Sequence, residues 1–180
     1  MKFIHTADWH LGKLFYGEYL TENQEWILKN RFLPILDEEK PDAVILAGDV
    51  YDRSVPPAEA VMLFDEMISE IVGKRHLPFL VISGNHDSAE RISFAGSILK
   101  NSGLYIYGDL KRTEPVILKD EYGEVAFVPL PYAEPGKVRE ALGIDVHTHE
   151  EAELALSRFL LEKIPHVQRK IAIAHEFVAG

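Results

Sequence analysis

The sequence predicts an α/β domain built on parallel strands. Short, continuous apolar segments such as residues 43–47 are typical of strands that are buried on both faces. Segments with helical spacing of apolar residues alternate with them, which favours parallel pairing through helical crossovers. Right-handed crossovers bring the C-terminal ends of such strands to one edge of the sheet, where ligands bind. We therefore expect one domain with its site at that edge.

The first strand is expected over residues 2–5, and residues 13–20 form a loop rich in aromatic side chains. Thr21 and Gln24 have the spacing of a capping box, which predicts the start of a helix. Pro34 lies within this helix and should kink it or mark a break, because proline lacks the backbone N–H. The chain therefore begins with a strand, a loop and a kinked or broken helix.

The rest of the chain continues the alternation. Pro56 and Pro57 open a second helix, since proline is favoured at a first helical turn. Residues 120–123 predict a turn that joins two strands in a hairpin. The further expected elements are strands over residues 43–47, 77–83, 104–107, 114–119, 124–130 and 170–175, and helices over residues 89–100, 134–142 and 149–163.

The composition fits a globular domain of 180 residues with a net charge of −10. The sequence has no cysteine, no apolar signal segment and no stretch that could span a membrane, so we expect a cytoplasmic protein. The acidic balance weakens a nucleic-acid hypothesis, because phosphate affinity comes largely from Lys and Arg. Two divalent cations bound in one cleft would change the local field without changing that overall charge.

Three polar clusters follow the first three expected strands, and each contains residues that bind metals. Asp8 and His10 form the first cluster, and their carboxylate and imidazole groups suit Mn, Fe or Zn. In extended backbone, residues two apart project to the same side, so both side chains can reach one ion. This pair alone is a weak signal, since a loop carboxylate beside a solvated histidine has the same sequence.

The second cluster is Gly48-Asp49-Val50-Tyr51-Asp52. Its glycine allows a sharp turn at the end of the strand. Asp49 would then point into the cleft, where its carboxylate can bridge two ions, and Asp52 follows one short turn later. Either aspartate could instead cap a turn or a helix, so the interpretation depends on the neighbouring clusters.

The third cluster, Gly84-Asn85-His86-Asp87, gives the most specific signal. Asn85 offers a neutral carbonyl oxygen as a ligand. His86 could protonate a leaving oxygen while Asp52 or Asp87 orients its ring. A polar turn is the competing interpretation, but it would have to hold at three consecutive strand ends. We therefore predict a two-metal site for the hydrolysis of phosphate esters.

A fourth candidate ligand, His175, follows the apolar residues 171–174. His147 and His149 precede an expected helix in an acidic stretch, and we expect both to be solvated. The sequence has no Gly-x-x-x-x-Gly-Lys-Ser/Thr loop, no Gly-x-Ser-x-Gly elbow and no cysteine nucleophile. The chain is therefore not a P-loop NTPase, and these two covalent mechanisms are not indicated.

The three clusters and the later histidine resemble the signature of the calcineurin-like metallophosphoesterase superfamily, and the surrounding residues are similar to its SbcD-type nucleases. The similar segments are residues 5–12, 47–52 with Pro56 and Pro57, 83–88 and 175–180. The resemblance covers the whole chain. It implies a layered β-sandwich flanked by helices, and it implies two bound divalent metal ions, usually Mn²⁺, with Mg²⁺ or other ions as alternatives.

The resemblance also implies a role for each residue. The metal ligands would be Asp8, His10 and Asp49 for one ion, and Asp49, Asn85 and His175 for the other, with Asp49 bridging the two. His86 would act on the leaving group, supported by Asp52. The implied activity is double-strand 3′–5′ exonuclease and single-strand or hairpin endonuclease activity in DNA repair and recombination.

The partners implied by the resemblance are DNA, the SMC-like ATPase subunit SbcC, and a second copy of the chain. Dimerisation would use helices that carry Met62, Leu63, Met67, Ile98 and Leu99, which could equally be ordinary core residues. Such nucleases have a Gly-His-x-His motif after the later histidine, and none follows His175 up to Gly180. We therefore expect residues 1–180 to be the N-terminal portion of a nuclease domain, without the capping and ATPase-binding regions.

Two other functions stay open. The chain could be another metallophosphoesterase that acts on nucleotides or phosphoproteins, or a catalytically incomplete assembly and dimerisation module. Trp9 with Leu11 and Gly12 favours the nuclease, whereas the net charge mildly disfavours DNA. Metal-dependent hydrolysis of a simple phosphodiester would separate the two enzymes from the assembly module.

Overall fold

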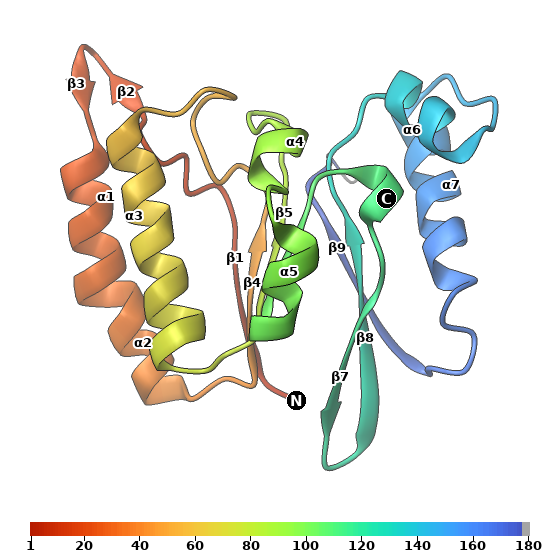
Figure 1. Cartoon of the computed structure of the whole chain (residues 1–180), viewed down its shortest axis with the longest axis horizontal. Coiled ribbons are helices and arrows are strands. Elements are labelled where there is room, and N and C mark those ends of the chain that lie inside the picture. Colours follow the sequence, from red (N-terminus) through yellow and green to blue (C-terminus); the bar gives the residue numbers. More distant parts are fainter. Residues whose placement is uncertain (178–180) are drawn as a thin grey trace.

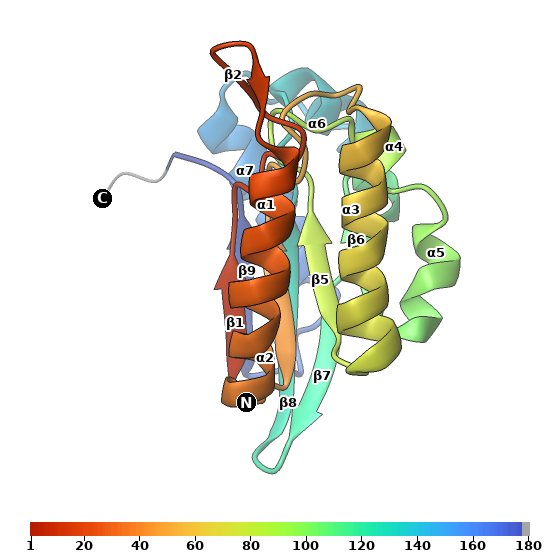
Figure 2. The ribbon, with the colours of Figure 1, turned by 90° about the vertical axis from the view of Figure 1, so that its left-hand side faces the viewer.

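The protein is a sandwich of two β-sheets with helices on both outer faces (Figure 1, Figure 2). This computed structural model describes residues 1–177 of the chain. It confirms the α/β fold and the layered, helix-flanked sandwich that the resemblance implied. Of the similar segment at residues 175–180, the last three residues, 178–180, lie outside the described part.

The first sheet is entirely parallel, with strand order β1-β4-β5-β6. Its strands are β1 (Phe3–Thr6), β4 (Ala43–Ala47), β5 (Phe79–Ile82) and β6 (Leu104–Tyr107). Thr6 pairs with Leu46 and Ala47 pairs with Ile82, so β1, β4 and β5 end at nearly the same level. The residues that follow these strands therefore meet at one edge, as the sequence predicts.

The second sheet contains β7 (Val116–Asp120), β8 (Gly123–Leu130) and β9 (Arg169–Ala174). The first two strands form the antiparallel hairpin predicted around residues 120–123. The last strand, β9, runs parallel to β8, and Ala174 lies opposite Leu130. The backbone N–H of Tyr132, after β8, donates to the carbonyl of Ser83, after β5, at 3.0 Å. The two sheets are thus joined at the edge that carries the polar clusters.

Helices cover the outer faces of the two sheets (Figure 1). The first sheet is covered by α1 (Thr21–Ile27), α2 (Leu33–Glu39) and α3 (Ala58–Ile68), and the second by α6 (Pro135–Leu142) and α7 (His149–Leu161). Two short helices, α4 (Ala89–Ile92) and α5 (Gly96–Leu99), connect β5 to β6, and a small hairpin of β2 (Leu14–Phe15) and β3 (Glu18–Tyr19) precedes α1. Within residues 1–177, no helix combines the length and apolar character needed to cross a bilayer.

The alternation of side chains along each strand separates the core into layers. In β4, Val44 and Leu46 pack under the helices, whereas Ile45 faces the second sheet. Phe127 lies between the sheets with no exposed surface, and its ring meets Phe3 edge-on at a centroid distance of 5.8 Å. Burial on both faces of the central strands explains why their sequences are continuously apolar.

The predicted capping box at the start of α1 is wrong. The N-cap residue is Leu20, and no side chain caps the helix. The Gln24 side chain instead donates to the carbonyls of Trp9 and His10, at 3.0 and 2.8 Å, and accepts from the Gly12 N–H at 3.1 Å. The Gln24 side chain thus makes tertiary contacts instead of the helix-capping contact that the local pattern predicted.

A break in the α-helix near Pro34 is confirmed, whereas two other elements differ from the prediction. A π-helical turn, Leu28–Phe32, separates α1 from α2, and Pro34 is the second residue of α2, so the helix adapts to the missing proline N–H. The helix expected over residues 89–100 is broken, because Ala95 has a left-handed φ of 57° and Ser93 Oγ bonds the N–H of Asp109 at 3.1 Å. The loop over residues 13–20 contains the β2–β3 hairpin.

Replacing Phe127 with alanine should leave a cavity between the sheets. We expect the free energy of unfolding to fall by about 3–5 kcal/mol, the usual cost of truncating a buried phenylalanine. Urea denaturation followed by circular dichroism measures this change. Tyr122→Ala at the hairpin tip, where the side chain is 77% exposed, is the matched control and should change stability by less than about 0.5 kcal/mol. Equal effects of the two substitutions would contradict the two-sheet core.

Candidate metal centre

The loops that follow β1 and β4 are held together by backbone hydrogen bonds. Asp8 N–H donates to the Gly48 carbonyl at 3.1 Å, and His10 N–H donates to the Asp49 carbonyl at 2.9 Å. Asp8, His10 and Asp49 have left-handed φ values of 55°, 44° and 49°. The expected extended backbone between Asp8 and His10 is therefore wrong, and strained loop geometry brings both side chains to one place.

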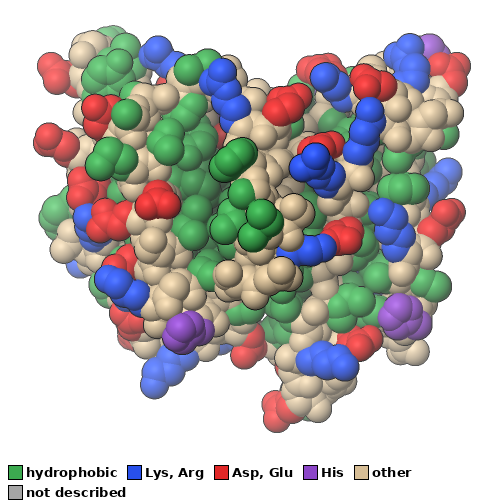
Figure 3. Space-filling model, viewed as in Figure 1, with side chains coloured by type: hydrophobic (Ala, Val, Ile, Leu, Met, Phe, Trp, Pro, Cys, Tyr) green, Lys and Arg blue, Asp and Glu red, His purple; other side chains and the backbone are tan. Residues whose placement is uncertain are grey.

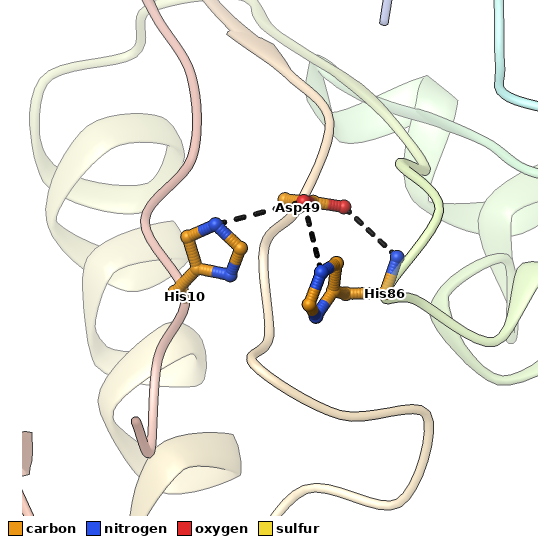
Figure 4. Close-up of side chains that lie close together, drawn as sticks. All are labelled: His10, Asp49 and His86. Atoms are coloured by element: carbon orange, nitrogen blue, oxygen red, sulfur yellow. Dashed lines mark hydrogen bonds and ion pairs between the residues drawn. The ribbon is translucent and has the colours of Figure 1, made fainter. Parts of the chain in front are cut away.

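Asp49 lies at the centre of the cluster and is only 3% exposed. Its Oδ2 lies 3.5 Å from Nε2 of His175, 3.6 Å from Nε2 of His10 and 3.9 Å from Nε2 of His86. Its Oδ1 accepts the backbone N–H of His86 at 3.0 Å. Figure 4 shows His10 and His86 approaching this carboxylate from two different loops. One buried carboxylate thus faces three imidazole nitrogens.

The arrangement fits two divalent metal ions that share Asp49. Two groups of three residues bring one ligand atom each to within 4.8 Å of one another: His10, Asp49 and His86, and Asp8, Asp49 and His175. Imidazole and carboxylate are ligands for first-row transition metals. The fit is supported by Nε2 of His10, which lies 3.6 Å from Oδ2 of Asp49 and 3.8 Å from Oδ1 of Asp8, too far from either for a hydrogen bond.

The tautomer of His175 is set by the main chain. Its Nδ1 lies 2.8 Å from the carbonyl oxygen of Ala47, so Nδ1 carries the proton and donates. The Nε2 lone pair is left to face Asp49 and Asn85, whose Oδ1 is 3.3 Å away. A histidine held in this way is oriented as a ligand before any ion binds.

His86 is positioned by Asp52, but not through the carboxylate. Its Nδ1 lies 2.9 Å from the backbone carbonyl oxygen of Asp52. The Asp52 carboxylate instead faces Nδ1 of His10 at 3.6 Å and Nζ of Lys13 at 3.4 Å. The His86 side chain is 42% exposed, so the ring can reach a substrate at the surface of the cluster.

All seven side chains selected from the sequence therefore lie in one cluster. Asp8 is the most exposed of the carboxylates, at 57%, and its Oδ1 lies 3.8 Å from Nε2 of His10. The structure groups His10 with His86 around Asp49, whereas the resemblance grouped His10 with Asp8. The division of these ligands between two ions stays a prediction.

Two glycines make room for this cluster. A Cβ atom at Gly48 would lie 2.2 Å from Nδ1 of His175, and the φ of +84° is itself unfavourable for other residues. A Cβ atom at Gly84 would lie 2.1 Å from Oδ1 of Asp49 and 2.3 Å from its backbone nitrogen. The sequence predicted the turn at Gly48, but not the space that both glycines provide.

Asp87 has a role that the sequence did not reveal. Its carboxylate accepts backbone N–H groups from Val50, Tyr51 and Gly84 at 3.1, 2.9 and 2.9 Å. Burial raises the pKa of Asp87, and these three hydrogen bonds oppose that rise. Asp87 therefore ties the second cluster to the third and does not orient the ring of His86.

The mouth of the centre contains residues that sequence reasoning missed. A hollow of about 730 Å³ is lined by Asp8, Asn85 and His175 and also by Tyr132, His149 and Glu176. The Tyr132 ring stacks on His149 at a centroid distance of 5.7 Å, so His149 is not simply solvated as expected. Tyr132 follows the end of β8, and the strand-end rule that selected the other clusters could have found it.

Comparison with known protein families agrees with this geometry. The calcineurin-like phosphoesterase family matches this chain over residues 1–177. The match covers both sheets and every residue of the cluster.

Gly84→Ala should disturb the centre without removing any ligand. The added methyl group must displace Asp49, so we expect the affinity for Mn²⁺, measured by isothermal titration calorimetry, to fall by about 10–100-fold. Gly73→Ala is the matched control, because an added Cβ there meets no atom within 4 Å. Unchanged Mn²⁺ affinity in a folded Gly84→Ala protein would show that Asp49 is not a ligand.

Proposed function

This chain belongs to the calcineurin-like phosphoesterase family, and from its site we propose that it is a metal-dependent DNA nuclease of the SbcD type. The family relationship gives hydrolysis of phosphate esters with divalent metal ions. The proposal adds the substrate, the exonuclease and endonuclease activities, Mn²⁺ as the usual ion, and a role in DNA repair and recombination in the cytoplasm.

The convergence of His10, His86 and His175 on the buried carboxylate of Asp49 carries the proposal. These residues come from three loops of the first sheet and from the end of β9 in the second. A buried carboxylate is costly unless cations balance it. Divalent ions bound between Asp49 and the imidazoles of His10 and His175 would supply that balance and would give the site its affinity for phosphate.

The protein's own groups have distinct tasks in hydrolysis. Divalent ions at these ligands, when bound, supply Lewis-acid activation of the phosphate and of a water molecule. His86 donates through Nδ1 to the Asp52 carbonyl, and this contact aims Nε2 at the cluster. A protonated His86 can then give its Nε2 proton to the leaving oxygen of the ester. The oxygen of Asn85 adds a ligand without adding negative charge.

The surface near the centre supports a nucleic-acid substrate. Lys13, which directly precedes the β2–β3 hairpin, contacts Asp52 in the cluster. The hairpin exposes Phe15, Tyr16 and Tyr19 by 54%, 93% and 59%. Exposed aromatic rings beside a basic group suit the stacking of unpaired bases. This feature favours DNA over a phosphoprotein, despite the net charge of −10.

The proposal includes a homodimer and an SMC-like ATPase, SbcC, as partners. Met62 and Ile98, two of the predicted interface residues, are each 71% exposed, and the neighbouring Phe94 is 80% exposed. Apolar side chains gather over α5 in Figure 3. Leu63 and Met67 are 4% and 0% exposed and belong to the core. A dimer surface on this side would therefore use the exposed residues alone.

Asp49→Ala should abolish nuclease activity and His86→Ala should reduce it strongly, for different reasons. Asp49→Ala removes the shared ligand, so metal binding and hydrolysis are both lost. His86→Ala keeps metal binding but lowers kcat by about 10²–10⁴-fold, the usual contribution of a general acid. Mn²⁺-dependent hydrolysis of bis(p-nitrophenyl) phosphate and of labelled double-stranded DNA ends measures both effects.

His147→Ala is the control for these substitutions, because His147 is 66% exposed and its ion pair is with Asp145, away from the cluster. Wild-type rates in Asp49→Ala or His86→Ala would overturn the site. Faster hydrolysis of mononucleotides or phosphopeptides than of DNA would favour another phosphoesterase. Metal binding without hydrolysis of any ester would favour an assembly module.

A further inference from the structure

A second hollow adjoins the metal centre and is not used by the proposed hydrolysis. It has a volume of about 650 Å³ and lies between the segment after β5, the start of α4 and helix α6. Asn85 and Tyr132 line both this hollow and the mouth of the metal centre. Figure 3 shows the molecule hollowed at its upper edge between α4 and α6, with charged side chains of both signs around the notch.

The lining of the second hollow combines apolar walls with a few polar groups. Leu110, Ala133 and Ala141 contribute apolar surface, and Lys111 and Lys137 contribute positive charge. This mixture and this volume are typical of sites for small organic groups. A nucleobase with its sugar has the same mixed character.

One buried polar group in the lining lacks a partner. Ser83 is 1% exposed, and its Oγ makes no hydrogen bond with the described part of the chain. Buried hydroxyl groups are normally hydrogen-bonded, because an unpaired one costs free energy. Ser83 lines the hollow, so a ligand or a water molecule held there can satisfy it.

The acidic side chains around the hollow are already occupied. The Asp87 carboxylate binds three backbone N–H groups, and Glu140 pairs with Lys111 at 3.1 Å. Asp109 accepts the N–H of Lys111 at 3.0 Å and pairs with Arg112. Glu134 accepts the hydroxyl of Tyr132 at 2.8 Å, and Glu90 accepts that of Ser88 at 3.2 Å.

The two lysines that line the hollow differ in whether they form an ion pair. Lys111 pairs with Glu140, whereas Lys137 has no ion pair within 4.0 Å in residues 1–177. Lys137 lies on the exposed side of α6, facing the hollow. The ammonium group of Lys137 is therefore the positive charge in this hollow that is available to a ligand.

We propose that the second hollow is a nucleoside subsite, which holds the sugar and base on one side of the scissile phosphate. The part of the substrate on the other side of that phosphate would extend through the mouth of the metal centre, beside His149 and Tyr132. Lys137 would contact the next phosphate along the strand. This inference rests on the proposed function and deepens it, because a site with room on both sides of the phosphate selects a diester within a chain over a monoester.

Lys137→Ala and Ala141→Phe test the subsite, with a single-stranded DNA octamer and bis(p-nitrophenyl) phosphate as substrates. Lys137→Ala should raise KM for the octamer about fivefold, as expected for the loss of one charged contact. Ala141→Phe should fill the hollow and weaken octamer binding, measured by fluorescence anisotropy, by about 10-fold or more. Both variants should hydrolyse the small diester at the wild-type rate.

Arg139→Ala and Arg139→Phe are the matched controls, because Arg139 is on the same helix but does not line the hollow. Arg139→Ala removes a positive charge, as Lys137→Ala does, and Arg139→Phe adds a phenyl ring, as Ala141→Phe does. Both controls should leave octamer binding and cleavage unchanged. The subsite would be overturned if Lys137→Ala and Arg139→Ala bound and cleaved the octamer equally well. This comparison holds even if Ala141→Phe fails to fold. Failure of the wild-type protein to hydrolyse either diester would instead overturn the proposed function, and the binding comparison would still test the subsite.

Discussion

The buried carboxylate of Asp49 is the group on which the rest of the site depends. It is 3% exposed, and its Oδ2 faces the Nε2 atoms of three histidines that come from three other segments. A buried charge of this kind is stable only where hydrogen bonds and opposite charges balance it. The N–H of His86 supplies one hydrogen bond, and neutral imidazoles supply no positive charge. Divalent cations bound between this carboxylate and the rings of His10 and His175 would therefore balance its buried charge.

The position of Asp49 also explains why the site needs both sheets. Asp8, Asp49 and His86 follow strands of the first sheet, whereas His175 follows β9 in the second. The hydrogen bonds from His175 Nδ1 to Ala47 and from Tyr132 N–H to Ser83 cross between the sheets at this edge. A ligand that binds both Asp49 and His175 would thus hold the two sheets together, so its binding would stabilise the packing of the sandwich.

Most of the fold and the membership of the cluster could be predicted from the sequence. The strand at residues 43–47 and the hairpin at residues 120–123 have local signals, because burial and turn chemistry are visible in short windows. The polar clusters were found because parallel strands end at one edge, which is a topological rule and not a local one. The division of the ligands between ions depends on distances that the sequence does not contain.

The failures at Gln24 and Asp87 share one physical cause, which is long-range contact. Gln24 looks like a capping residue, but its amide binds the carbonyls of Trp9 and His10 fourteen to fifteen residues earlier. Asp87 looks like a partner for its neighbour His86, but its carboxylate binds N–H groups 36–37 residues away. In both cases a polar side chain satisfies backbone groups of a strained loop. A local pattern predicts the residue's chemistry correctly but assigns it to the wrong partner.

The acidic balance of the chain has a consequence for substrate binding. Asp8, Asp49 and Asp52 lie in one cluster, and the whole protein carries a net charge of −10. Without cations, this edge of the sandwich repels a phosphodiester. Two divalent ions would add four positive charges at the point where a phosphate must bind, while the remaining surface stays acidic. Affinity for a polyanion would then be confined to the immediate surroundings of the metal centre. Binding of a phosphate ester would then coincide with the place where it is hydrolysed.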